Sequence, residues 1–232
     1  VHVIPIYGAK GYEDRFVPFL SDRWLDYLSF ICQEAQRMGM GVDVTLGTGW
    51  PFGGKHIMPQ LGAQKIKWQG ADFGTVPTLQ KVKRAAPGGE GLVLDHFDKG
   101  SFAHYVSPSG FDRLAALPIR AVYNDSYEAF DANWTADLEQ KFRAAKGYEL
   151  RPWLPLLRPD APETNTLRRI LTDNREVMSE LLLSDFTRPF ADWASQRSKI
   201  IRNQAHGSPG NLLDLYAASH IPETESFGSS NF

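Results

Sequence analysis

The stretch IRAVYNDSYE, residues 119–128, contains the pattern that decides the fold. Its first half is a short apolar run with β-branched and aromatic residues, and its second half is polar, with Asn124, Asp125, Ser126 and Glu128. Buried parallel strands have such apolar runs, and α/β folds place reactive groups directly after the carboxyl ends of these strands. The stretch therefore predicts a buried strand followed by a site, with Glu128 as the candidate reactive group. A turn and cap formed by Asp125 and Ser126 is the structural alternative.

Apolar runs followed by polar residues recur elsewhere in the chain. They occur at residues 1–6, 42–46 and 200–201, and stretches with the apolar spacing of amphipathic helices lie between them. Such alternation is typical of parallel βαβ units, and polar clusters at the carboxyl ends of the strands favour a TIM-type barrel over a doubly wound sheet. The sequence therefore predicts an α/β fold of the (β/α)8 type.

Capping residues mark the ends of the expected helices. Ser21 and Thr135 are the expected N-caps of two helices, and Gly147 is expected to end the second of them. A long helical pattern covers residues 163–197. Pro189 lies within this pattern and is expected to kink the helix or to split it in two.

Length and composition limit the domain organisation. The chain has 232 residues, of which 42% are hydrophobic, so it can bury one sizeable core. We therefore expect residues 1–232 to be part of a single domain. Between residues 59 and 90 the periodicity fades and Gly and Pro are scattered, which predicts an irregular excursion from that domain.

The charge balance and the single cysteine exclude several classes of partner. Lys plus Arg number 25 and Asp plus Glu number 27, so neither nucleic acid nor an anionic membrane is an expected partner. Cys32 is the only cysteine, which excludes a disulfide within the chain, and its place on an apolar helix face predicts a packed thiol. No apolar run reaches about 18 residues, and no basic region precedes an apolar one at the start, so neither a membrane span nor a signal peptide is expected in this chain.

The run GVDVTLGTGWPFGG, residues 41–54, ends in a glycine-rich loop around Trp50. It lacks both the Lys-Ser or Lys-Thr ending of a P-loop and the GxGxxG spacing of dinucleotide sites. Stacking of Trp50 on a sugar ring is the functional interpretation of this loop, and a core position for Trp50 is the structural alternative.

His96 and His104 have no tight metal spacing, so we expect ordinary polar or helix-surface histidines.

Several candidate residues converge if the expected strands lie side by side. Glu128, His206, Glu223 and Glu225 then meet at one mouth of the barrel. In glycoside hydrolysis, one protonated carboxyl group protonates the leaving oxygen, and a second carboxylate activates water or attacks. The residues thus favour a carbohydrate-active barrel, although the same carboxylates also suit Ca²⁺. The candidate substrate-binding residues are Asp43, Trp50, Asn124, Asp125, Trp134, Asn203 and His206.

Longer motifs carry a resemblance to a known family. They are VHVIPIYGAKGYEDRFVPFLS, VDVTLGTGWPFGG, KRAAPGGEG, NDSYE followed by NWT, KGYELRPWLPLL, RNQAHGSPGNLLDLY and IPETESFG. Together they resemble the α-L-rhamnosidases of glycoside hydrolase family 106 across almost the whole chain. The resemblance implies a (β/α)8 catalytic domain, inversion at the anomeric carbon and dependence on calcium. It also implies that Glu128 is the general acid, and that Glu223 and Glu225 act as calcium or substrate ligands or as a second carboxylate.

The resemblance also sets expectations about what surrounds this chain. Members of the family are far larger, so the chain is expected to be the central part of the barrel, about strands two to six, with the missing parts of its own barrel as partners. The family's general base is expected on a later strand, and nothing here matches it. A rhamnose-containing glycan or glycoside is the expected substrate, in a polysaccharide-degrading enzyme that is periplasmic or secreted in a bacterium. An inactive barrel fragment or a non-catalytic carbohydrate-binding scaffold is the alternative.

Overall fold

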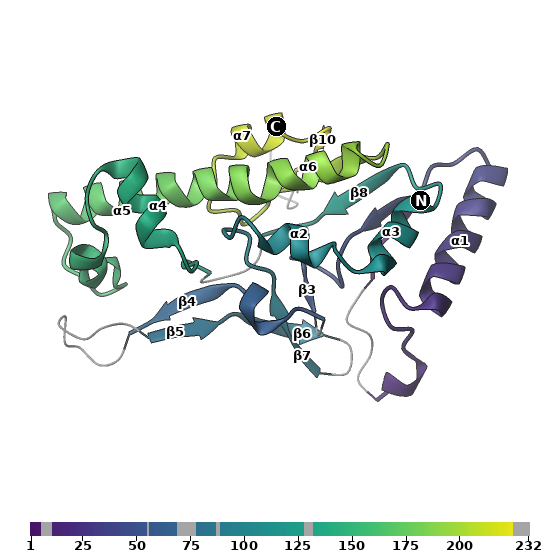
Figure 1. Ribbon diagram of the computed structural model, residues 1–232, viewed down its shortest axis with the longest axis horizontal. Coiled ribbons are helices and arrows are strands. Elements are labelled where there is room, and N and C mark those ends of the chain that lie inside the picture. Colours follow the sequence, from purple (N-terminus) through teal and green to yellow (C-terminus); the bar gives the residue numbers. More distant parts are fainter. Residues whose placement is uncertain (6–10, 55, 69–77, 87–88, 128–131, 225–232) are drawn as a thin grey trace, which may run out of the picture.

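The computed structural model describes residues 1–5, 11–54, 56–68, 78–86, 89–127 and 132–224 (Figure 1). Its central feature is a parallel sheet with the strand order β1-β2-β8-β9-β10, in which every adjacent pair is parallel. The strands are β1 (His2–Val3), β2 (Asp43–Thr45), β8 (Ala121–Asn124), β9 (Ile200–Asn203) and β10 (Ile221–Pro222). The predicted α/β class with a parallel sheet is confirmed. The described strands form an open sheet, so closure into a barrel stays a prediction.

The first helix follows its capping signals. Helix α1 (Asp22–Arg37) begins after Ser21, whose Oγ accepts a hydrogen bond from the backbone N–H of Trp24 at 3.3 Å. Cys32 is 2% exposed on the buried face of this helix, and burial raises the pKa of its thiol. The predicted N-cap and packed thiol are both confirmed.

Helix α4 (Leu138–Lys146) ends at the predicted residue but does not begin at the predicted N-cap. It ends at Gly147, which adopts a φ of +78° as glycine readily does. The predicted N-cap is wrong, because the helix starts after Asp137 and the Thr135 hydroxyl instead donates to Asp95 Oδ2 at 3.0 Å. A tertiary partner thus replaces the local capping bond.

The long helical segment is interrupted by a π-helical insertion at Leu182–Thr187 and not split at Pro189, which corrects the expectation for that proline. Helix α5 (Asn165–Leu181) continues into the π-helical segment η4 (Leu182–Thr187) and then into α6 (Arg188–Ser195), whose first turn holds Pro189. Proline has no backbone N–H to donate, so the first turn of α6 is a position where it costs little. The remaining helices are η1 (Glu13–Arg15), η2 (Pro59–Leu61), α2 (Ser101–Tyr105), α3 (Ser109–Ala116), η3 (Arg151–Leu157) and α7 (Leu212–Ala217).

The excursion at residues 59–90 contains ordered strands, which corrects the expectation of irregular structure. Strands β4 (Gln64–Lys67) and β5 (Thr78–Lys81) pair antiparallel, and β7 (Gly89–Val93) pairs antiparallel with both β3 (Gly53–Gly54) and β6 (Lys83–Ala86). β4 and β5 are rich in Lys and Gln, and β3 and β7 are rich in Gly, so these short strands carry little apolar periodicity. Figure 1 shows them below the parallel sheet. A Cβ at Gly91 would lie 2.5 Å from the carbonyl carbon of Gly54, so glycine is required there.

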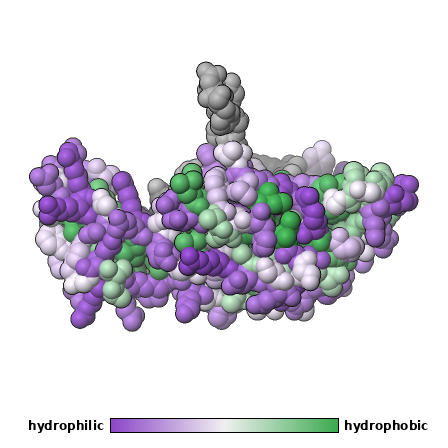
Figure 2. Space-filling view, turned by 90° about the horizontal axis from the view of Figure 1, so that it is seen from above, coloured by the Kyte–Doolittle hydropathy of each residue, from purple (hydrophilic) through white to green (hydrophobic). Residues whose placement is uncertain are grey.

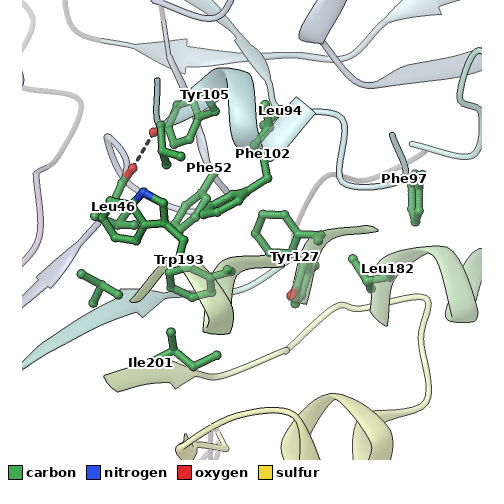
Figure 3. Packing of buried hydrophobic residues seen from close by; sticks show 14 of the residues in the cluster. Leu46, Phe52, Leu94, Phe97, Phe102, Tyr105, Tyr127, Leu182, Trp193 and Ile201 are labelled. Carbon is green, nitrogen blue, oxygen red and sulfur yellow. Dashed lines mark hydrogen bonds between the residues drawn. The ribbon is translucent and has the colours of Figure 1, made fainter. Parts of the chain in front are cut away.

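One face of the parallel sheet packs against the helices. Val44, Val122 and Ile201, from three neighbouring strands, are 0% exposed and join a core with Leu28 of α1 and Phe190 of α6. Figure 3 shows that aromatic side chains dominate one part of this core, near Phe52, Phe102 and Tyr127. Each fully buried side chain of this size contributes about 1.5–3 kcal/mol to folding. The core therefore fixes the sheet firmly against α1 and α6.

The outer surface near α5, α6 and α7 is mixed in character. Figure 2 shows hydrophobic residues reaching the surface over the middle of this face, whereas the end near α4 and α5 is mainly hydrophilic. Leu212 and Leu213 of α7 are 43% and 77% exposed. No helix within the described ranges combines the length and the apolar character needed to cross a membrane.

Candidate functional site

Two loops meet where β8 and β9 end, and we call residues 124–127 and 203–206 the strand-end cluster. Asn124 Nδ2 donates to Asn203 Oδ1 at 3.0 Å, and the backbone N–H of Gln204 donates to the Asn124 carbonyl at 3.2 Å. The Tyr127 N–H donates to the His206 carbonyl at 2.7 Å. Four of the candidate substrate-binding residues therefore lie together: Asn124, Asp125, Asn203 and His206.

The strand-end cluster contains buried polar atoms without hydrogen-bond partners. Among the described residues these atoms are Asn124 Oδ1, Ser126 Oγ, Asn203 Nδ2 and Gln204 Oε1. A buried polar atom that makes no hydrogen bond costs about 1–3 kcal/mol, so native proteins normally satisfy such atoms with water or a ligand. Ala205, in the same cluster, has a φ of +56°, a strained conformation of the kind that gathers at functional sites. The cluster thus combines unmet hydrogen-bonding capacity of neutral groups with a strained backbone position.

Trp50 lies in the loop after β2 and is 39% exposed. It stands between Gly49, with a φ of +86°, and Pro51, to which it is joined by a cis peptide bond. The alternative of a core position for Trp50 is therefore wrong, and stacking on a sugar remains a prediction. Trp134, in contrast, is 8% exposed and packs in the core. This burial corrects the interpretation of Trp134 as a substrate-binding surface, because its ring faces other protein side chains.

A second polar group lies on the other face of the parallel sheet, and we call it the ion-pair layer. It consists of His2, Asp43, Thr45, Arg120, Tyr123, Arg202 and Glu223. Arg202 Nη1 donates to Asp43 Oδ2 at 2.7 Å, and Arg202 Nε donates to Glu223 Oε1. The Arg202 guanidinium lies over the Tyr123 ring, 5.0 Å from its centre. All five parallel strands, or the residues next to them, contribute to this layer.

Asp43 is held by two arginines in this layer. Arg120 Nε donates to Asp43 Oδ1 at 2.8 Å, while Arg202 binds Oδ2, and the Asp43 side chain is only 3% exposed. Burial raises the pKa of Asp43, but the hydrogen bonds from Arg120 and Arg202 outweigh it and hold the pKa below its usual value. Asp43 also begins strand β2 rather than ending it. This corrects its assignment as a substrate-binding residue, because both oxygens already have protein partners.

The described carboxylates do not fit a calcium site. No group of three or more His, Cys, Asp or Glu residues in the described part of the chain could hold a metal ion. Glu223, whose backbone N–H donates to the Asn203 carbonyl at 3.0 Å, gives one side-chain oxygen to Arg202. Glu128 and Glu225 lie outside the described residues. Glu223 thus joins the two polar groups of the sheet, but it does not form a metal centre with its described neighbours.

His96 is a buried residue that sequence reasoning misplaced on the surface. It is 3% exposed, and its ring stands edge-on to Phe186 and Tyr127 with centroid distances of 4.3 and 5.4 Å. Its Nε2 has no hydrogen-bond partner among the described residues, and burial lowers its pKa to about 3. His104 is exposed on α2, as expected. The apolar neighbours of His96 in the sequence VLDHF were the available signal for burial.

Asp95 precedes His96 and was also missed as a buried group. Its Oδ1 accepts a hydrogen bond from the Phe97 N–H at 3.0 Å, and its Oδ2 accepts one from the Thr135 hydroxyl at 3.0 Å. Burial raises its pKa to about 6, against the opposing effect of these two bonds. Its surroundings differ from those of Asp43 because no arginine contacts it among the described residues.

Comparisons with known proteins give the chain a family context. The sequence model of the α-L-rhamnosidase family matches residues 63–214. A protein of Formosa agariphila, provisionally named a β-glucuronidase, is 31% identical over 165 residues, which are 68% of this chain and 14% of that protein. A solved rhamnosidase structure from Novosphingobium sp. PP1Y is 24% identical, with a TM-score of 0.47, over 60% of this chain and 14% of that one. The chain therefore spans a small part of the length of either relative.

Proposed function

The chain belongs to the α-L-rhamnosidases of glycoside hydrolase family 106, and on this premise we propose that it takes part in hydrolysing terminal α-L-rhamnosyl linkages. The observation that carries the proposal is the strand-end cluster, where two loops meet through three hydrogen bonds and leave neutral buried atoms unpartnered. Amide and hydroxyl groups of this kind match the hydroxyl groups of a neutral sugar. Trp50, exposed on the loop after β2, supplies a ring on which a sugar face can stack.

We propose the chemistry of an inverting glycosidase. Glu128, the residue after Tyr127, acts as general acid and gives its proton to the glycosidic oxygen as the bond to the anomeric carbon breaks. A second carboxylate removes a proton from the attacking water on the opposite face of the sugar. Glu225 and Glu223 are the candidates in this chain. The ion pair with Arg202 engages one oxygen of Glu223, which leaves Oε2 for such a contact.

The parallel sheet supports a barrel as the setting of this site. The strand order follows the chain, and neighbouring strands are parallel, which is the arrangement of consecutive strands in a (β/α)8 barrel. We propose that β1 and β10, the outer strands of the described sheet, pair with the remaining strands of such a barrel. Dependence on calcium and a periplasmic or secreted location stay predictions from the family, and loss of activity on chelation would test the former.

A glucuronide is the second candidate substrate, suggested by the provisional name of the Formosa protein. A uronic acid carries a carboxylate, which proteins usually bind with an arginine fork. Arg120 and Arg202, the arginines of the ion-pair layer, are already paired with Asp43 and Glu223. The neutral strand-end cluster therefore favours rhamnose, a sugar without a carboxylate, over glucuronate.

The proposal is tested by the release of nitrophenol from an aryl α-L-rhamnoside, with calcium supplied and an aryl β-glucuronide in parallel. We expect rhamnoside hydrolysis to fall in Glu128→Gln, by less than the roughly 10²–10⁴-fold typical of lost general acid catalysis, because nitrophenolate leaves readily without a proton. Hydrolysis of the glucuronide but not of the rhamnoside would show that a glucuronide, rather than a rhamnoside, is the substrate. Rhamnose binding that is unchanged in Glu128→Gln, without turnover by the unmodified protein, would instead identify a non-catalytic carbohydrate-binding scaffold.

A further inference from the structure

A line of buried polar contacts leads from the strand-end cluster into the helix layer. Asn124 Nδ2 donates to Asn203 Oδ1 at 3.0 Å, and the Asn203 side chain also lies near the Tyr127 hydroxyl. The Tyr127 hydroxyl contacts Thr187 Oγ1 at 3.3 Å, and the Thr187 hydroxyl donates to the Leu182 carbonyl at 3.0 Å. These four side chains are 4% exposed or less. The line therefore runs from the ends of β8 and β9 to the π-helical segment η4 without contact with solvent.

The direction of the hydrogen bonds follows from the number of protons. Thr187 has one hydroxyl proton and gives it to the Leu182 carbonyl, so Tyr127 must be the donor to Thr187 Oγ1. The Tyr127 oxygen then has lone pairs left for the Asn203 amide, whose Nδ2 reaches no full hydrogen-bond geometry with any partner in the described part of the chain. Thr187 is thus the acceptor that fixes the Tyr127 hydroxyl.

Segment η4 also holds the surroundings of Tyr127 in place through Phe186. The Phe186 ring lies 5.7 Å from the Tyr127 ring, 4.3 Å from His96 and 5.6 Å from Phe52, with an edge-on geometry in each case. Figure 3 shows Tyr127 within the aromatic cluster, on the side of Leu182. Single-turn π insertions inside α-helices are frequently found at functional sites. This one brings Phe186 and Thr187 together against Tyr127.

We propose that Thr187 is a positioning residue for the strand-end cluster. Its hydroxyl fixes the Tyr127 side chain, and the Tyr127 N–H in turn donates to the His206 carbonyl, the bond that joins the two loops. Loss of the Thr187 hydroxyl leaves the buried Tyr127 hydroxyl without its acceptor, which favours a shift of the loop at residues 124–127. The expected effect of Thr187 on substrate hydrolysis rests on the proposed function of the cluster.

The variants that test this proposal keep the shape of the side chain. Thr187→Val removes the hydroxyl, whereas Thr187→Ser retains it and is the rescue variant. Thr172→Val is the matched control, because Thr172 lies on α5 and its hydroxyl also donates to a carbonyl of the preceding turn, that of Arg168, at 2.9 Å. Thr172 is exposed, and its hydroxyl bond lies within α5, away from the residues of the strand-end cluster.

The first measurement is amide hydrogen exchange, which does not depend on catalysis. In Thr187→Val we expect exchange about 10-fold faster at the amides of Tyr127 and Gln204, which join the two loops. The Arg120 amide, bonded to the Val42 carbonyl at the other end of β8, should keep its rate, as should all three amides in Thr187→Ser and Thr172→Val. Equal acceleration at Arg120, or no change at Tyr127, would overturn the proposal.

The second measurement is hydrolysis of the aryl α-L-rhamnoside by the full protein. We expect kcat/KM to fall about 10-fold in Thr187→Val and to recover in Thr187→Ser, with Thr172→Val unchanged. Local acceleration of exchange with an unaltered kcat/KM would overturn the positioning role. If the unmodified protein hydrolyses no rhamnoside while exchange at Tyr127 responds as expected, the proposed function fails, but the positioning of the cluster by Thr187 stands.

Discussion

The strand-end cluster and the ion-pair layer belong to the same parallel sheet but satisfy their polar groups in opposite ways. In the ion-pair layer, Asp43 and Glu223 each have an arginine partner, and Arg202 bridges them. In the strand-end cluster, buried neutral atoms of Asn124 and Asn203 lack partners among the described residues.

This difference separates charged groups whose hydrogen-bonding capacity is met by arginine from buried neutral groups whose capacity is unmet. A carboxylate with two arginine partners, such as Asp43, would lose strong interactions if it turned to a substrate. An unpartnered amide atom gains when a hydroxyl group or water reaches it. Asp43 is therefore a residue of the ion-pair layer, whereas unmet hydrogen-bonding capacity lies at the ends of β8 and β9.

The strongest test of the ion-pair layer is the removal of its bridging arginine. Arg202→Met leaves Glu223 without its ion pair and Asp43 with Arg120 alone, so we expect the free energy of unfolding to fall by about 4 kcal/mol. Urea unfolding measures this change. Arg113→Met is the control, because Arg113 and Asp22 form an exposed pair whose loss should cost less than about 1 kcal/mol. Equal losses in the two variants would mean that the layer does not stabilise the fold.

Asp95 sharpens the comparison, because it is buried like Asp43 but has no arginine. Burial raises its pKa from 3.8 to about 6, so its contribution to stability is complete below about pH 4 and is lost as the pH rises to about 6. We expect this loss to be about 3 kcal/mol and to be absent in Asp95→Asn. Unfolding curves across this pH range measure it.

Asp43 is expected to show the opposite pH dependence. The pKa of Asp43 is lowered, so its stabilising effect is present above its ordinary pKa and is lost as the pH falls below that value. Asp43→Asn should therefore remove part of the loss of stability in acid. The same pH slope in Asp95→Asn and in the unmodified protein would contradict the account of Asp95.

The smallest expected effect concerns Trp50, in the loop after β2. Trp50→Ala removes an exposed ring, so we expect stability to stay within about 0.5 kcal/mol while affinity for a rhamnoside falls about 10-fold. Trp153→Ala is the matched control, because Trp153 is 37% exposed, close to the 39% of Trp50, and lies on η3. Calorimetric titration measures both affinities. An equal loss in the two variants would remove the specific role of Trp50.

Local signals predicted the framework of the fold well. The cap at Ser21, the end of α4 at Gly147 and the parallel strands all follow from patterns within a few residues. The meeting of Asn124 with Asn203 was also predictable, because the carboxyl ends of neighbouring parallel strands share one edge of the sheet.

Contacts between distant residues were beyond such patterns. Asp43 and Arg202 are 159 positions apart, and the sequence around either residue does not predict their ion pair. Thr135 matched a helix cap locally, but in the folded chain its hydroxyl donates a hydrogen bond to Asp95 Oδ2. Strands β4 and β5 pair without a periodic apolar pattern, since their residues are mostly Lys, Gln and Thr. In each of these cases the structure depends on a residue that is distant in the sequence. Sequence patterns identify interaction partners only when they are a few residues apart.

The central claim, that the sugar binds at the strand-end cluster and not beside Asp43 and Arg202 in the ion-pair layer, is tested most directly by nuclear magnetic resonance. The measurement is a titration of the isotope-labelled chain with methyl α-L-rhamnoside, followed through its backbone amides. We predict that the amides of Asp125, Gln204 and His206 shift with a common saturation curve, while that of Asp43 stays in place. Shifts confined to Asp43 and Arg202, or saturation without any shift at the ends of β8 and β9, would contradict the account.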